Sequence, residues 1–249
     1  MKYPLLITTI VFALSSCKHT RTQESNLSVE DLYDQGISNL ENSDYKEAIE
    51  NFSKVFYKNP SHKLTAQSEV MHAYSLYKKE EYDDVIDVVD IFLNLHPRHP
   101  EAAYMRYLKA LSYYVQISDI KLDQESSQHA LSSLKEVMDK HPGSKYAIDS
   151  AKKFDSVLDH LAGKEVLIGT YYLKNKNPIA AIKRFQKVLS DYSSTPHMPE
   201  SLYRLVEANL AIGLKNEAVK YQKILMEKYR ETQWFEFSQQ LLPLPTIVI

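Results

Sequence analysis

The chain has 249 residues and a formal net charge of −2 at pH 7, with 5 glycines and a single cysteine. This charge balance argues against a nucleic-acid-binding protein, because phosphate binding needs a basic surface. The few glycines exclude a glycine-rich phosphate loop, and one cysteine excludes an intrachain disulfide. The abundance of leucine, alanine, lysine and glutamate favours helix throughout.

Residues 1–16 have the pattern of a bacterial lipoprotein signal peptide. A short basic start precedes an apolar run from Pro4 to Leu14, which is shorter than the roughly 20 residues that a membrane-spanning helix needs. Leu14, two serines and Cys17 resemble the lipoprotein cleavage motif, in which the thiol takes a diacylglyceryl group before cleavage. We therefore predict lipid attachment at Cys17. The alternative is an ordinary signal peptide with an incidental cysteine.

Residues 17–28 are predicted to be a flexible tether, because most of them are polar and show no apolar periodicity. Several acyl chains on Cys17 would give a lasting anchor, at about 0.8 kcal/mol per buried CH₂ group. Lys18 stands where an aspartate would signal retention in the inner membrane. The sequence therefore predicts a lipid-anchored protein of the outer membrane that faces the periplasm.

The first folded segment carries the pattern of a tetratricopeptide repeat, a helix–turn–helix unit of about 34 residues. Gly36 and Ala48 would let two helices touch, Phe52 would fill the remaining space, and Pro60 would end the second helix. The same register recurs in four further repeats. The second repeat carries Tyr82, Val85, Val89, Phe92 and Pro97, and the third carries Ala130, Leu134, Val137 and Pro142. The fourth carries Gly169, Ala181, Phe185 and Val188, and the fifth carries Leu202–Gly213, Ala218, Leu225 and Tyr229.

These repeats predict an all-α fold, a tetratricopeptide superhelix (α-solenoid) of about five helix pairs. The alternative is a generic helical bundle with coincidental alanines. We divide the folded part into repeats 1–3 (residues 29–143), a long bridging helix with repeats 4–5 (residues 144–232) and a C-terminal tail (residues 233–249), whose last seven residues, from Pro243, are apolar apart from one threonine.

Prolines and glycines set the expected helix boundaries. Pro100 should occupy the first helical position of the third repeat, and a polar insert should follow near residues 118–127. The expected helices cover residues 29–42, 45–58, 64–79, 82–95, 100–117 and 144–175, with further helices opening at Asn177-Pro178 and Pro199-Glu200.

No enzyme motif is present: GxxxxGK[ST], GxSxG, HExxH and CxxC are all missing from the sequence. We predict a protein that is not an enzyme and that needs no cofactor. His96 and His99 flank a turn, and we expect no metal there. Asp83, Asp87 and Asp90 form an acidic stripe at helical spacing, which we interpret as a solvated face; the alternative is the footprint of a basic partner.

A binding groove is expected on the first helices of the repeats, which line the concave face in this class of protein. Tyrosine suits peptide binding because it offers a large apolar ring and a hydroxyl at low entropy cost. For each of these positions, a place in the core is the alternative. The candidate groove residues are Tyr33, Val70, Tyr74, Tyr77 and Tyr104.

The lipoprotein signal, the short tether, the five repeats and the long bridging helix together resemble the BamD family of outer-membrane β-barrel assembly lipoproteins. The residues that carry the resemblance are Asn94–Pro100, Tyr104–Arg106, His141–Tyr146, Gly169–Tyr172 and Ala180–Phe185.

The resemblance implies two binding surfaces on a membrane-tethered adaptor. The N-terminal repeats would recognise the aromatic-ended tails of unfolded outer-membrane proteins. The C-terminal repeats would hold the POTRA region of BamA, with Arg184 paired to an acidic POTRA residue. Contacts with accessory Bam lipoproteins stay open. The alternative functions are a pilus-assembly pilotin and a coordinator of cell division or peptidoglycan synthesis.

Overall fold

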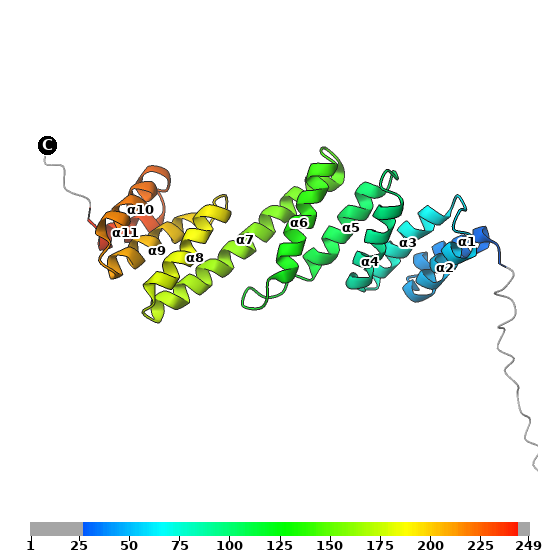
Figure 1. Ribbon diagram of the computed structural model, residues 1–249, viewed down its shortest axis with the longest axis horizontal. Helices are drawn as coiled ribbons and strands as arrows, with labels where there is room; N and C mark the ends of the chain where they lie inside the picture. The colour runs from blue at the N-terminus through cyan, green and yellow to red at the C-terminus, as the bar shows by residue number, and fades with distance from the viewer. Residues whose placement is uncertain (1–26, 244–249) are drawn as a thin grey trace, which may run out of the picture.

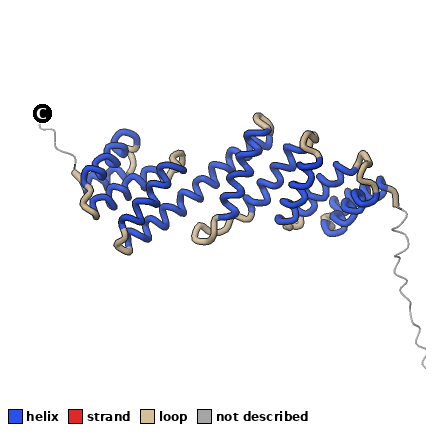
Figure 2. Tube along the Cα trace, viewed as in Figure 1, coloured by secondary structure: helices blue, strands red, loops and turns tan. Residues whose placement is uncertain are grey.

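The computed structural model describes residues 27–243, which form eleven α-helices arranged as an elongated right-to-left row (Figure 1). Loops between the helices are short, and this part of the chain contains no strand (Figure 2). The helices are α1 Val29–Glu41, α2 Tyr45–Lys58, α3 Thr65–Lys78, α4 Tyr82–Leu95, α5 Ala102–Val115, α6 Glu125–Lys140, α7 Lys145–Lys174, α8 Pro178–Asp191, α9 Met198–Ala211, α10 Lys215–Lys228 and α11 Gln233–Leu241.

Each helix packs against the next along the chain, so that α1–α2, α3–α4, α5–α6, α7–α8 and α9–α10 form five successive pairs. The apolar faces of neighbouring pairs complete one another, which is the packing of a solenoid. The predicted all-α fold of about five helix pairs is therefore confirmed.

The repeat pattern has a direct steric cause. A Cβ atom built on Gly36 would lie 2.6 Å from the ring of Phe52, and one built on Gly169 would lie 2.6 Å from the ring of Phe185. Both phenylalanines are almost fully buried. A larger residue at either glycine would push the paired helices apart, since core packing leaves no free volume.

Most helix boundaries lie within two residues of those expected, and α2 and α4 match them at both ends. The position predicted for Pro100 was wrong, because α5 begins at Ala102 with Glu101 as its N-cap. The Ala102 amide donates to the His99 carbonyl over 2.9 Å, so Pro100 lies in a turn before the helix. Pro178 does begin α8, behind an Asn177 side chain that caps the helix.

The bridging helix α7 has 30 residues and begins at the Ser144 cap. The polar insert expected near residues 118–127 is shorter at its end, because α6 already begins at Glu125; the connection covers residues 116–124. It packs against the middle of α7: the Lys164 ammonium donates to the Leu122 carbonyl over 2.9 Å. A Cβ atom at Gly163 would lie 2.9 Å from the Ile120 side chain. Gly163 therefore provides the space into which the insert fits.

A helix that the sequence did not indicate, α11, occupies the first part of the segment described as a tail. It covers α9 and α10 at the end of the row (Figure 1). Within residues 27–243, no helix combines the length and apolarity needed to cross a membrane. Cys17 and the tail beyond Pro243 lie outside the described residues.

Candidate functional site

A hollow of about 300 Å³ lies between α3, α5 and the start of α7, and we call it the tyrosine groove. Three of the five predicted groove residues line it: Val70, Tyr74 and Tyr104. Val70 is only 3% exposed, so it forms the floor and not an exposed contact. The complete lining is Gln67, Val70, Met71, Tyr74, Glu101, Tyr104 and Tyr146.

The other two predicted residues do not line this hollow. The Tyr33 ring packs edge-on against Phe52, with ring centroids 5.7 Å apart. The Tyr77 ring packs against Tyr82 at 5.5 Å. Both side chains fill space within a helix pair, which is the core alternative that the sequence left open.

Sequence reasoning missed four lining residues, Gln67, Met71, Glu101 and Tyr146, of which Tyr146 is the aromatic one. It follows the cap of α7, two helices beyond Tyr104, yet the two rings lie 5.7 Å apart. The Lys145 ammonium lies 5.0 Å from the centre of the Tyr146 ring, within the range of a cation–π contact. This proximity results from the packing of α7 against α5, which the spacing of Tyr104 and Tyr146 in the sequence does not predict.

The chemistry of the tyrosine groove suits a polypeptide ligand. Burial raises the pKa of Tyr104 well above its usual value, so its hydroxyl stays protonated and can donate a hydrogen bond. Glu101 supplies the one carboxylate in the lining. Aromatic faces with hydroxyl groups at their edges offer apolar contact and hydrogen bonding together.

Tyr107 fixes the wall behind the groove. Its hydroxyl donates to the Asp149 carboxylate over 2.5 Å, and its ring lies 5.2 Å from that of Tyr146. Hydrogen bonds from Lys153 and Tyr107 lower the pKa of Asp149, which keeps this acceptor charged. Tyr104 and Tyr146 thus face the groove from two helices, α5 and α7, that Tyr107 joins.

Arg184, the residue expected to pair with a partner protein, has a partner within the chain. Its guanidinium donates to Glu165 on α7 over 3.1 Å. The side chain of Arg184 is still 40% exposed, whereas that of Glu165 is 11% exposed. Large exposed side chains nearby in the α7–α8 hairpin are Tyr171 and Ile179.

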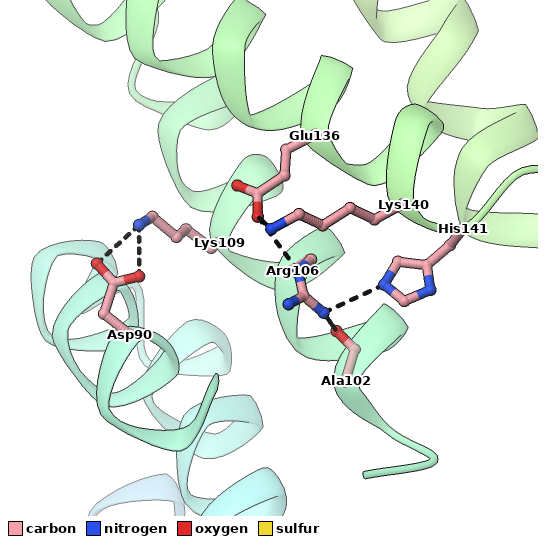
Figure 3. Close-up of polar contacts among 7 residues, drawn as sticks. All are labelled: Asp90, Ala102, Arg106, Lys109, Glu136, Lys140 and His141. Carbon is pink, nitrogen blue, oxygen red and sulfur yellow. Dashed lines mark hydrogen bonds and ion pairs between the residues drawn. The ribbon is translucent and has the colours of Figure 1, made fainter. Parts of the chain in front are cut away.

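A polar cluster ties α4, α5 and α6 together (Figure 3). Lys109 donates to both oxygens of Asp90, over 2.6 and 2.7 Å. Arg106 donates to Glu136 over 3.2 Å and lies 3.2 Å from Nε2 of His141. Lys140 also donates to Glu136, over 2.7 Å. Among the described residues, no group of three or more histidine, cysteine or acidic side chains could hold a metal.

Helix pairs that close over a glycine–phenylalanine contact and stack in one row define a tetratricopeptide-type solenoid, a class that presents extended surfaces to other polypeptides. The comparison with known proteins gives the family. Residues 25–225 match the model of YfiO, described as an outer membrane lipoprotein. The chain therefore belongs to this family.

Two relatives with extensive coverage carry the same name, outer membrane protein assembly factor BamD. The outer membrane protein assembly factor BamD of Rickettsia prowazekii is 44% identical over 94% of this chain and 93% of its own length. BamD of Caulobacter vibrioides is 39% identical over 86% of this chain and 70% of its own. Among solved structures, the TPR2AB domain of yeast Sti1 aligns with a TM-score of 0.47 at 13% identity, covering 86% of this chain and 83% of that one.

Proposed function

We propose that this protein is an outer-membrane protein assembly factor, tethered through a lipid on Cys17 to the periplasmic side of the outer membrane. Membership of the YfiO family and 44% identity to a BamD protein support the assembly role. Tethering raises the effective concentration of two partners that meet on one scaffold. The observation that carries the proposal is this family match over most of the chain.

The first proposed partner is an unfolded outer-membrane protein, bound in the tyrosine groove. Tyr74, Tyr104 and Tyr146 would contact an aromatic side chain of the client, since aromatic pairs contribute about 0.5–1.5 kcal/mol beyond their buried area. The groove lies in the N-terminal half of the row, which leaves the C-terminal repeats free for a second partner.

The second proposed partner is the POTRA region of BamA, held by the α7–α8 hairpin. Arg184 would exchange its intrachain partner Glu165 for an acidic residue of BamA. The exposed fraction of Arg184 and the neighbouring Tyr171 and Ile179 support this interface. An interfacial charge pair of this kind fixes register and orientation.

The test is the affinity of the full mature chain for BamA, measured after purification from detergent-solubilised envelopes. Arg184→Ala should weaken binding about tenfold or more, because it leaves a charge on the partner unpaired. Glu165→Gln should bind at least as well as the unchanged protein, because it releases Arg184. The double variant Arg184→Ala with Glu165→Gln avoids leaving a buried carboxylate unpaired and should bind as weakly as Arg184→Ala.

If Arg184→Ala and Glu165→Gln lose equal affinity for BamA, the pair only holds the α7–α8 hairpin together. The interface with BamA would then lie elsewhere on the chain. Thermal melting of each variant separates this outcome from unfolding. Recovery of a pilus or cell-division complex without BamA would contradict the proposed function and leave only a tethered solenoid scaffold.

A further inference from the structure

A second hollow, of about 160 Å³, lies on the opposite side of α3 from the tyrosine groove, and we call it the α2–α4 hollow. Glu69 and His72 of α3 face it, whereas Val70 and Tyr74 of the same helix face the groove. The α2–α4 hollow is lined by Phe52, Ser53, Phe56, Tyr57, Glu69, His72, Val88, Ile91 and Phe92. The proposed function uses none of these residues.

The rim of the hollow exposes large apolar side chains. Tyr57 on α2 is 77% exposed, and Ile91 and Leu95 on α4 are 58% and 56% exposed. Ile91 and Leu95 are four residues apart and so share one face of α4. Single exposed apolar residues are common on proteins. Here Tyr57 and Ile91 line an apolar concavity, and Leu95 lies on the same face of α4 as Ile91. Such an arrangement is typical of a surface that receives another side chain.

The charge beside the hollow is negative. Helix α4 contains four aspartates and neither lysine nor arginine. Asp83 and Asp84 lie in its first turn, where the helix dipole favours acids, but Asp87 lies beyond that turn without such a role. Asp90 is neutralised by Lys109 (Figure 3). Helix α2, across the hollow, carries three lysines and two glutamates, a net charge of +1. The three aspartates that remain on α4 outweigh it.

Two polar groups form the floor of the hollow. The Glu69 carboxylate lies 3.2 Å from Nε2 of His96. Burial lowers the pKa of His72, and the nearby Asp84 carboxylate opposes this effect. Asp84 lies four residues before Val88, which lines the hollow, so the two side chains share one face of α4.

We infer that the α2–α4 hollow docks a basic segment of a partner protein, with one large aliphatic or aromatic side chain inserted between Tyr57 and Ile91 and cationic residues against Asp84 and Asp87. The buried anchor would supply most of the affinity, and the aspartates would select positive charge and speed association. Asp87, one of the three residues of the acidic stripe, is then part of a binding surface and not only of a solvated face.

The probe is an acetylated and amidated six-residue peptide with one leucine flanked by lysines and arginines, labelled with a fluorophore. Its anisotropy is measured with the full mature chain in zwitterionic nanodiscs, and empty nanodiscs correct for binding to lipid. The same peptide with glutamates in place of the basic residues should bind at least tenfold more weakly. Binding of the basic peptide should weaken as salt is raised.

Three substitutions locate the binding. Ile91→Ser should weaken binding of the basic peptide about tenfold. The double variant Asp84→Asn with Asp87→Asn should weaken this binding about threefold to tenfold. Ile148→Ser is the matched control, because Ile148 is a comparably exposed isoleucine on α7, 60% exposed, and lines neither hollow. Tyr104→Ala, in the tyrosine groove, should leave this binding unchanged, which separates it from the proposed client site.

The inference is overturned if the basic peptide does not bind, if the glutamate peptide binds as well, or if Ile91→Ser has no more effect than Ile148→Ser. Unfolding does not confuse the readings at Ile91, Asp84 and Asp87, because these side chains are exposed. Tyr104 is partly buried, so the melting temperature of Tyr104→Ala is measured beside its binding.

Discussion

At the scale of single residues, the fold depends on a few close contacts that the repeat pattern encodes. Gly36 with Phe52 and Gly169 with Phe185 use the same geometry in two helix pairs. The polar contacts differ from pair to pair, and Arg106 is a clear case: it links α5 to α6 through Glu136 and His141. The repeat pattern therefore predicts the apolar contacts but not the polar ones.

Gly169→Ala should lower the free energy of unfolding by about 1–2 kcal/mol. Overpacking against Phe185 costs about 1–3 kcal/mol, and the better helix propensity of alanine returns up to about 1 kcal/mol. Urea unfolding measures the change. The double variant Gly169→Ala with Phe185→Leu should lose less stability than the sum of the two single variants; an increase in stability for Gly169→Ala alone would contradict the steric argument.

His141 should make stability depend on pH. Burial, and then the Arg106 and Lys140 charges, lower its pKa in the folded state. The unfolded chain therefore takes up a proton first, and stability falls as pH drops below about 6.5, until the folded state also protonates. His141→Gln cannot titrate, so its free energy of unfolding should fall less between pH 7 and pH 5. Identical pH profiles for the two proteins would rule out this contribution.

At the scale of helices, most elements begin and end where turns and capping residues set their boundaries. Helix α11 is the exception, because it belongs to no helix pair and has no repeat pattern. It is held by Gln222 of α10, whose side-chain amide donates to the carbonyls of Ser238 and Leu242 over 3.2 and 2.6 Å. Gln222 is only 2% exposed, so a glutamine that reads as a surface residue in the sequence is a buried connector.

Gln222→Leu should destabilise the end of the solenoid by about 1–3 kcal/mol, because two buried carbonyls lose their donor. Hydrogen exchange should become faster in α11 and α10 while α1–α4 stay unchanged, since repeats communicate mainly with their neighbours. Gln186→Leu is the control: it removes only an exposed hydrogen bond to Tyr221. Unchanged exchange in α11 of the Gln222 variant would contradict the connector role.

At the scale of the whole molecule, the elongated row places α3 and α5, which line the tyrosine groove, apart from α8, which carries Arg184 (Figure 1). Helix α7 belongs to both regions: Tyr146 at its start lines the groove, and Glu165 in its second half holds Arg184. A continuous 30-residue helix is a stiff connection. Two partners bound at these places would therefore be held at a fixed distance, as the proposed adaptor role requires.

The sequence by itself determined the class of fold, the register of the repeats and the long bridging helix, because small residues, rings and prolines act on neighbours within one or two helices. Tertiary structure alone decided that Tyr146 joins Tyr104, that Tyr33 and Tyr77 pack inside helix pairs, and that Arg184 pairs with Glu165. The first contact depends on how one helix pair packs on the next, and the others depend on which faces the two helices of a pair turn toward each other. Neither kind of contact follows a fixed spacing in the sequence.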